Sequence, residues 1–442
     1  MKKHLFTPLL ALGMLACNDD DNGTIVDPVE PASFRVTVAN VATEYPIFQS
    51  GIFNTPDGTS DAGPATPGQA YTFSFYATPG MNLSLASMLV QTNDVFIAQD
   101  DDSGIPLFDG TGIPLEGDIT SMFTFWDAGT EVNEEPGNGP NQAPRQSGPD
   151  TGTDEGEMVI LLSDVNDGYS YPAIEDVVKI TLDVSDNDSN LFTLTISNIS
   201  GSSSLPGPIS PGAYAVHTNA VQLFENNQTA SDGIEDIAED GDPSVLGTFA
   251  TDNTGLVTPF SPGVYLVHSD GSMPLFTEGM NDTGDGLENI AEDGDPSSLA
   301  VVLGSNGDVS SSGVFNTPES ASTPGPIFPG QSYSFTIEGS PGDQFNLATM
   351  LIQSNDLFIA FEDGGLPLFN GTDAVNGDVT SGLRIWDTGT EANEFPGAGQ
   401  NQAPRQSGTN VGESETEPIS EVNDAFAYPA VSDIIQVTIE EI

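Results

Sequence analysis

The sequence is short of positive charge, and this shortage restricts the partners it can have. Lys and Arg together number 7 in 442 residues, against 66 Asp and Glu, and the formal net charge is -59. Nucleic acids and anionic lipid headgroups need clustered Lys and Arg to displace their counterions, so nucleic acid is excluded as a partner. The surplus of carboxylates instead favours divalent cations.

The sequence also lacks residues on which disulfide bonding and common types of catalysis depend. Its single cysteine, Cys17, excludes intramolecular disulfides and leaves buried apolar surface and bound metal as sources of stability. It contains no Gly-x-Ser-x-Gly elbow, no HExxH motif and no phosphate-binding glycine loop with Lys. Paired carboxylates could serve glycoside hydrolysis, but among so many acids some pair will always look suitable. We therefore expect a protein that is not an enzyme, and rank a carbohydrate-active enzyme third among the functions considered.

The N-terminus has the pattern of an export signal. Lys2 and Lys3 precede an apolar stretch, 5–15, which is too short for a permanent membrane span, and Ala16 then precedes Cys17. This pattern resembles a bacterial lipoprotein signal, whose cleavage leaves the cysteine as the lipid-bearing first residue. We expect a signal peptide at 1–17 with Cys17 as the lipid site, an acidic flexible tether at 18–32, and an outer-membrane or cell-surface lipoprotein attached only through that lipid. Plain secretion is the alternative.

The rest of the chain reads as strands joined by turns. Short apolar runs alternate with clusters of Gly, Pro, Asn and Asp, a pattern typical of antiparallel β-sandwiches. The run "FRVTVANV" at 34–41 alternates apolar and polar residues, and "LFTLTISNIS" at 191–200 restarts that pattern after a polar break. The fold class we predict is mainly β, with two antiparallel β-sandwich domains at 33–184 and 191–442 and a linker at 185–190.

Two similar units lie in tandem within the second predicted domain. They cover 210–246 and 261–299, and both follow the pattern SPGxYxVH...AEDGDPS. Each ends in a predicted short helix, because apolar residues such as Ile234, Ile237 and Ala238 recur at i, i+3 and i+4 before a Gly-Asp-Pro stop. We therefore expect inserted helices in the second domain only.

The order of motifs resembles the spondin N-terminal domain family, the module of F-spondin and mindin. The matching stretches of the second copy are "SPGVYLVHSDGSMPLF", "DGLENIAEDGDPSSL", "MLIQSNDLFIA", "IWDTGTE" and "YPAVSDIIQVTI". The first copy matches from "SGIFNTP" at 50–56 onward and lacks the segment with the VH strand and helix. The resemblance implies a β-sandwich that binds calcium at one end and acts in adhesion and recognition.

Four aspartates are the main candidates for metal ligands. Asp94 and Asp356 lie where a polar turn meets an apolar strand, whereas Asp127 and Asp387 follow a Trp and precede a Gly that permits a tight turn. Turns at one end of a sandwich can converge the several hard oxygens that calcium needs. The resemblance implies that both Asp pairs are calcium ligands; turn capping is the alternative explanation for these residues.

The resemblance also implies a third ligand, a Glu on an earlier strand. Near that position this chain has Ser74 in the first copy and Thr336 in the second, with Glu338 two residues further on. Glu131 and Glu391, four residues after the loop aspartates, are further candidates. The function we expect is non-catalytic adhesion or recognition of an extracellular protein or glycan. A structural matrix or envelope protein without a discrete ligand is the runner-up to this function.

The loops at 126–148 and 386–408 are nearly identical, and both end in "NQAPRQSG". Each contains one of the few arginines, Arg145 or Arg405. A guanidinium can donate two hydrogen bonds in parallel, so we expect each Arg to clamp its loop against neighbouring acidic turns.

Overall fold

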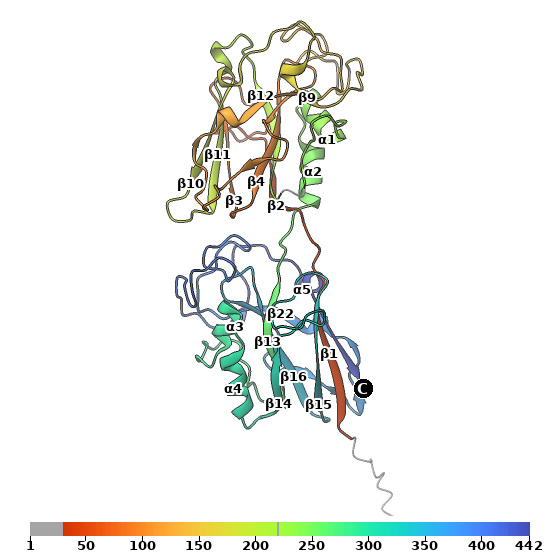
Figure 1. Cartoon of the computed structure of the whole chain (residues 1–442), viewed down its shortest axis with the longest axis vertical. Coiled ribbons are helices and arrows are strands. Elements are labelled where there is room, and N and C mark those ends of the chain that lie inside the picture. The colour runs from red at the N-terminus through yellow and green to blue at the C-terminus, as the bar shows by residue number, and fades with distance from the viewer. Residues whose placement is uncertain (1–29, 219–220) are drawn as a thin grey trace, which may run out of the picture.

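The computed structural model describes residues 30–218 and 221–442, which form two domains of three layers each (Figure 1). The layers are a four-stranded antiparallel sheet, a seven-stranded antiparallel sheet and a helical layer on the outer face of the larger sheet. The prediction of a mainly β protein with antiparallel sandwiches is confirmed. The predicted signal peptide, Cys17 and most of the tether lie outside the described residues. Within the described part of the chain, no helix is both long and apolar enough to cross a membrane.

The first domain contains sheets whose apolar faces share one core. Phe75 and Phe192 of the smaller sheet pack with Leu85 and Ile97 of the larger one. The smaller sheet has the order β3 (Ala70–Tyr76), β11 (Leu191–Asn198), β10 (Val178–Val184), β7 (Gly117–Asp118). The larger has the order β2 (Ile47–Phe53), β12 (Ile209–His217), β4 (Asn82–Leu89), β5 (Val95–Gln99), β8 (Phe123–Asp127), β9 (Ile160–Leu161), with β6 (Ile105–Pro106) beside β4.

The second domain repeats this topology. Its smaller sheet has the order β15 (Ser332–Gly339), β1 (Ala32–Asn40), β24 (Ile435–Glu441), β21 (Gly377–Asp378). Its larger sheet has the order β14 (Val309–Phe315), β13 (Phe260–Ser269), β16 (Asp343–Leu351), β17 (Leu357–Phe361), β22 (Leu383–Asp387), β23 (Ser420–Glu421), with β18 (Leu366–Pro367) beside β16. A small hairpin joins β19 (Phe369–Asn370) to β20 (Asp373–Ala374).

Each domain has its own helices, so the prediction that only the second has them is wrong. The first has α1 (Asp232–Glu235), the π-helical turn η5 (Asp236–Asp240) and α2 (Ser244–Asp252); the second has α3 (Leu287–Asp293), α4 (Ser297–Ser305) and α5 (Val431–Ile434). The predicted apolar positions Ile234, Ile237 and Ala238 are fully buried against the larger sheet. Single 3-10 turns complete the set: η1 (Thr120–Met122), η2 (Leu162–Asp164), η3 (Ile174–Asp176), η4 (Ser200–Ser202) and η6 (Thr380–Gly382).

Strand pairing corrects the predicted domain boundaries. β1 belongs to the second domain, where Val36 pairs with Phe335 of β15 on one side and with Ile439 of β24 on the other. β11 belongs to the first domain, between β3 and β10. The segment 185–190, predicted as a linker, is the turn between β10 and β11. Alternation in a strand specifies its buried face, and β1 and β11 have the same alternation, so the pattern could not assign their partners.

The first domain is therefore inserted into the second, between β1 and β13. The unit at 210–246, predicted for the second domain, supplies β12 and the helices of the first. Two chain segments cross between the domains, as Figure 1 shows. They are joined by two backbone hydrogen bonds: the N–H of Ile47 donates to Asn253 O at 3.2 Å, and the N–H of Gly255 donates to Ile47 O at 3.1 Å.

A loop of the second domain packs against the first domain. The ring of Phe395 stacks on Tyr76 at 4.1 Å and lies 6.0 Å from Phe48. Nearby, Asn190 Nδ2 of the first domain donates to Ala398 O at 2.5 Å. The loop at 126–148 has the exposed Glu135 where the other loop has Phe395. This difference between the two loops is explained by their positions, because only the loop of the second domain faces a neighbouring domain.

Replacing Phe395 with Ala should weaken the coupling between the domains. Loss of two aromatic contacts is expected to lower that coupling by about 1 to 3 kcal/mol. Calorimetry should then show two thermal transitions further apart than in the wild type. The matched change Glu135→Ala, at the equivalent position of the other loop, should leave the transitions in place. An unchanged calorimetric profile for Phe395→Ala would contradict the contact.

Candidate metal centre

The register of two strands brings each predicted Asp pair together. Asp94 directly precedes β5 and Asp127 ends β8, and the antiparallel register sets Val95 opposite Asp127. In the second domain, Leu357 lies opposite Asp387 at the same point of β17 and β22. Neighbouring antiparallel strands therefore bring two carboxylates together at one end of the strands of each seven-stranded sheet.

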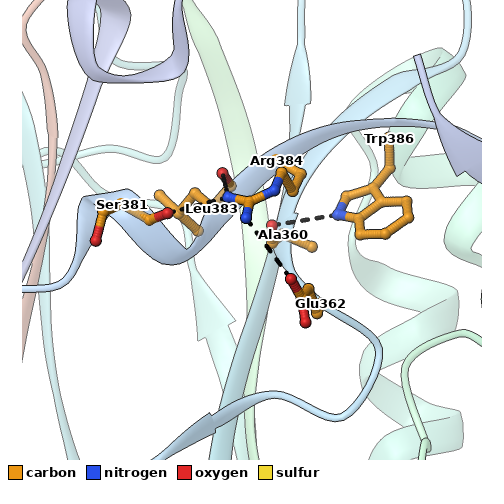
Figure 2. Close-up of polar contacts among 6 residues, drawn as sticks. All are labelled: Ala360, Glu362, Ser381, Leu383, Arg384 and Trp386. Carbon is orange, nitrogen blue, oxygen red and sulfur yellow. Dashed lines mark hydrogen bonds and ion pairs between the residues drawn. The ribbon is translucent and has the colours of Figure 1, made fainter. Parts of the chain in front are cut away.

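A buried Trp holds the end of the strand that carries the second Asp. Figure 2 shows Trp386, whose indole Nε1 donates to Ala360 O of the neighbouring strand at 3.3 Å. Trp386 is 2% exposed and packs on Phe276 with ring centroids 4.9 Å apart. In the other copy, Trp126 donates to the carbonyl of Gln99 at 2.9 Å. Each Trp fixes the strand end, so the following Asp has a defined position.

The first Asp of each pair is fully buried and only partly hydrogen-bonded. Asp94 Oδ2 accepts from the backbone N–H of Thr130 at 3.1 Å and of Glu131 at 3.2 Å, but Oδ1 has no partner. Asp356 repeats this arrangement, with Oδ2 accepting from the N–H of Thr390 at 2.9 Å and of Glu391 at 3.1 Å and with Oδ1 again without a partner. A buried polar atom without a partner is strongly unfavourable. The same atom is without a partner in both copies, at the place where the carboxylates could hold a metal ion.

The second Asp of each pair is oriented by the loop that follows it. Asp127 accepts from the Gly129 N–H at 2.9 Å through Oδ1 and from Asn133 Nδ2 at 2.6 Å through Oδ2. Asp387 has the equivalent bonds, from Gly389 N–H at 2.7 Å and from an Asn side chain at 2.7 Å. These bonds act as turn caps, and they also fix each carboxylate beside its partner.

A glutamate that the sequence reasoning missed completes each group. Asp94, Asp127 and Glu155 form the first trio, and Asp356, Asp387 and Glu415 form the second trio. In each trio the residues offer carboxylate oxygens that all lie within 4.8 Å of one another, so these acidic groups could hold a metal ion. Asp94 and Asp356 are fully buried, whereas Glu155 is exposed and Glu415 is half-buried. The sequence does contain a sign of this third acid, because Glu155 and Glu415 lie at the same distance after the loop Asp in the two copies.

The other candidates for a third ligand lie elsewhere. Glu338 is exposed on β15, in the smaller sheet, and accepts from the Ser33 hydroxyl at 2.9 Å. Ser74 is exposed on β3, in the equivalent strand, and bonds the Thr193 hydroxyl at 2.9 Å. The strand expected to supply a Glu therefore belongs to the other layer of the sandwich, and the prediction for Glu338 is not supported.

Glu131 and Glu391 are buried beside the Asp pairs, where their backbone N–H groups donate to Asp94 and Asp356. The Glu131 carboxylate accepts from Asn93 Nδ2 at 3.1 Å and from the Gly152 N–H at 2.5 Å. It groups with Asp150 and Glu239 rather than with Asp94. Glu131 is therefore not grouped with Asp94 and Asp127, whereas the assignment of Glu391 as a metal ligand stays a prediction.

Burial makes the first Asp of each pair hard to ionise without a cation. Desolvation, followed by the charge of Asp387, raises the pKa of Asp356 to about 7. Desolvation and the charge of Asp127 raise the pKa of Asp94 well above its ordinary value, and desolvation also raises that of Asp127. A bound cation would replace these protons and satisfy the free oxygens.

Both trios open to solvent through a pocket. Asp127 and Glu155 line an open pocket of about 610 Å³, and Asp387 and Glu415 line one of about 500 Å³. A cation held by either trio would therefore lie at the wall of a pocket that a second molecule can enter.

The repeated arginines clamp their loops, but not against acidic turns. Arg145 Nε donates to Gly139 O at 2.8 Å and Nη2 donates to Gln142 Oε1 at 2.7 Å. Arg405 has the equivalent bonds to a glycine carbonyl and a glutamine amide of its own loop. Among the described residues the ion pairs are Arg35 with Glu440 at 3.0 Å and Arg384 with Glu362 at 3.6 Å, the second of which Figure 2 shows. The clamp is thus built from neutral acceptors, which corrects the expectation of acidic partners.

Comparison with protein-family models and with curated proteins finds no match to this chain.

Proposed function

We propose that this chain is a non-catalytic recognition protein in which each domain holds one calcium ion at its trio. The observation that carries the proposal is the duplicated buried Asp, Asp94 and Asp356, each with one oxygen left without a partner beside two more carboxylates. A turn cap needs no further carboxylates beside a fully buried Asp, so capping alone does not account for this arrangement.

The donor set favours calcium over softer metals. Both trios offer carboxylate oxygens only, which suits hard cations, whereas zinc and copper sites use His or Cys. Calcium takes about 6 to 8 oxygens in a flexible shell, so three carboxylates leave room for water or a ligand from the pocket. Magnesium, which needs a near-ideal octahedron, is the competing hard cation.

Recognition rather than catalysis is supported by the sequence and by the position of the trios. The chain contains none of the common catalytic motifs, and its motif order resembles the spondin N-terminal domain family. We propose export with lipid attachment at Cys17, and an extracellular protein or glycan as partner. Hydroxyl or carboxylate oxygens of such a partner could complete the calcium shell from the pocket. Two domains on one anchored chain would raise the effective concentration at a multivalent target.

Calcium should stabilise the protein through the trios. Extracellular calcium modules bind at roughly 0.1 to 1 mM, and a concentration about 100 times the dissociation constant adds about 2.7 kcal/mol. The melting temperature should therefore rise by roughly 5 to 10 °C. The double variant Asp94→Asn with Asp356→Asn should lose most of this rise, as measured by thermal unfolding with and without calcium.

The matched control for this experiment is Glu44→Gln with Glu116→Gln, which removes the same charge from two exposed positions. The control should keep the full rise. An equal rise in the Asp double variant would place the calcium elsewhere, and no rise in the wild type would reject the proposed ion.

Recognition itself is tested on an array of glycans and extracellular matrix proteins. Binding should be lost on chelation and in the Asp double variant, but kept in the Glu control. Calcium-dependent stabilisation without any ligand would favour the structural protein, and turnover of a bound glycan would reject the non-catalytic assignment.

A further inference from the structure

We propose a second cation site in each domain, separate from the trio, where the helical layer meets the long loop that follows the Trp-Asp turn. In the first domain it consists of Glu131, Asp150 and Glu239, and in the second of Glu391 and Glu292; we call these groups the helix–loop clusters. The proposal does not rest on the trios binding calcium.

The first helix–loop cluster gathers three acids from separate segments of the chain. Glu131 and Asp150 come from the loop after β8, and Glu239 comes from the π-helical turn η5. Their carboxylate oxygens lie within 4.8 Å of one another. Glu131 is 3% exposed and Glu239 is 4% exposed. No Lys or Arg forms an ion pair with them in the described chain, so no protein cation balances their charge.

The second helix–loop cluster supplies independent evidence of a missing ligand. Glu292 of α3 is 2% exposed, and its Oε1 accepts from the Thr390 hydroxyl at 2.7 Å. Its Oε2 is buried and has no hydrogen-bond partner. The charge that most disfavours ionisation of Glu292 is that of Glu391, the loop acid of the same cluster. A buried carboxylate oxygen of Glu292 is therefore without a hydrogen bond while the charge of Glu391 opposes its ionisation.

The two clusters differ by one acid. Asn410 occupies the position that Asp150 has in the first domain, and its Nδ2 donates to Glu288 Oε1 at 2.8 Å instead of adding a carboxylate. Calcium affinity depends on the number of charged ligands. We therefore assign the tighter site to the first domain and the weaker one to the second.

The helices also contact the loops around each cluster. Gln146 Nε2 donates to Asp240 Oδ1 at 2.5 Å, and Gln406 Nε2 donates to Asp293 Oδ1 at 2.8 Å. A cation between Glu131 and Glu239 would join the same two segments by a stronger contact. This role gives a structural reason for the near-identity of the two loops, since each has to fit the helix of its own domain.

Protons are the competing occupants of these clusters. Desolvation raises the pKa of Glu239 and of Glu292 to about 8, so each can be a neutral acid near pH 7. A neutral acid opposes cation binding because it must first lose its proton, whereas an ionised carboxylate binds the cation directly. Occupation by a proton and occupation by a cation can therefore be distinguished by experiment.

The test counts bound calcium ions on the full chain by equilibrium dialysis at about 0.15 M salt, which screens diffuse binding to the acidic surface. Both sites in each domain predict four ions per chain, and trios alone predict two. The variant Glu239→Gln with Glu292→Gln should lower the count from four to two, whereas Glu44→Gln with Glu116→Gln should keep four. Asn410→Asp should tighten the weaker site, a gain that structural damage cannot produce.

The trio variant separates this inference from the proposed function. If Asp94→Asn with Asp356→Asn removes two ions and leaves two, the clusters bind ions independently and the inference holds. If the wild type binds two ions that only the Glu239 and Glu292 changes remove, the inference holds and the calcium sites proposed at the trios fail. A count that the Glu239 and Glu292 changes do not lower, or tightening absent in Asn410→Asp, overturns the inference.

Discussion

A fragment of residues 45–256 is expected to fold alone, whereas a fragment of residues 191–442 is expected not to fold. The first contains every strand of the inserted domain. The second lacks β1, which lies between β15 and β24, and with it the fully buried side chains of Phe34, Val36 and Val38. Burial of one such side chain contributes about 1.5 to 3 kcal/mol, and three together approach the 5 to 15 kcal/mol that stabilise a whole domain. Circular dichroism and urea unfolding should show cooperative folding of the first fragment only.

Complementation provides the control for this prediction. A fragment of residues 257–442 should gain cooperative unfolding when a peptide of residues 30–44 is added, because the peptide restores the pairs of Val36 with Phe335 and Ile439. The same peptide with Val36→Asp should not restore it, since a charge would face the core. Cooperative unfolding of residues 191–442 without the peptide would show that β1 is dispensable and would contradict the insertion.

The strands were predictable from local pattern, but their partners were not. In β1 the buried side chains alternate with exposed or half-buried ones, as the sequence predicts for a strand with one face on a core. The equivalent strand β11 shows the same alternation. Either strand could fill either place by this criterion, and chain order alone assigned each to the nearer domain. The choice depends on which two strands each one lies between, β15 and β24 or β3 and β10, and local periodicity does not contain that information.

The candidate site could be predicted to the extent that its residues occupy distinctive turns. Asp94 and Asp127 were found because a strand end and a Trp-Asp-Gly turn mark them. Glu155 lies in a loop rich in other acids, where nothing local separates a ligand from a solvated carboxylate. Glu239 has the position of an ordinary acidic residue at the end of a short helix. Its approach to Glu131 depends on how the helical layer packs over the sheet, which sequence pattern does not specify.

The buried acids also set how stability depends on pH. The pKa of Asp356 is about 7 and those of Glu239 and Glu292 are about 8 in the folded state, all above the values of about 4 that unfolded chains have. The folded state therefore holds protons that the unfolded state releases. The stability that these three acids contribute to the metal-free protein is then fully present below about pH 4 and is lost progressively until about pH 8. The buried His217 and His268 act in the opposite direction below about pH 6.5, because burial lowers their pKa.

Calcium should reverse the loss of stability that the buried acids cause as the pH rises. This reversal is the most specific consequence of the proposed sites. At about pH 5 the buried acids retain their protons, so calcium competes poorly and should raise the melting temperature little. At about pH 8 little free energy is needed to ionise the buried acids, so the rise in melting temperature on adding calcium should be largest. Urea unfolding of the chelated and calcium-loaded protein at each pH measures both trends. The variant Asp94→Asn, Asp356→Asn, Glu239→Gln, Glu292→Gln should show a flatter pH profile and little calcium effect, while retaining the histidine contribution. A metal-free wild type that gains stability from pH 4 to pH 8 as the variant does would contradict the buried acids as the cause, because their raised pKa values require the opposite slope.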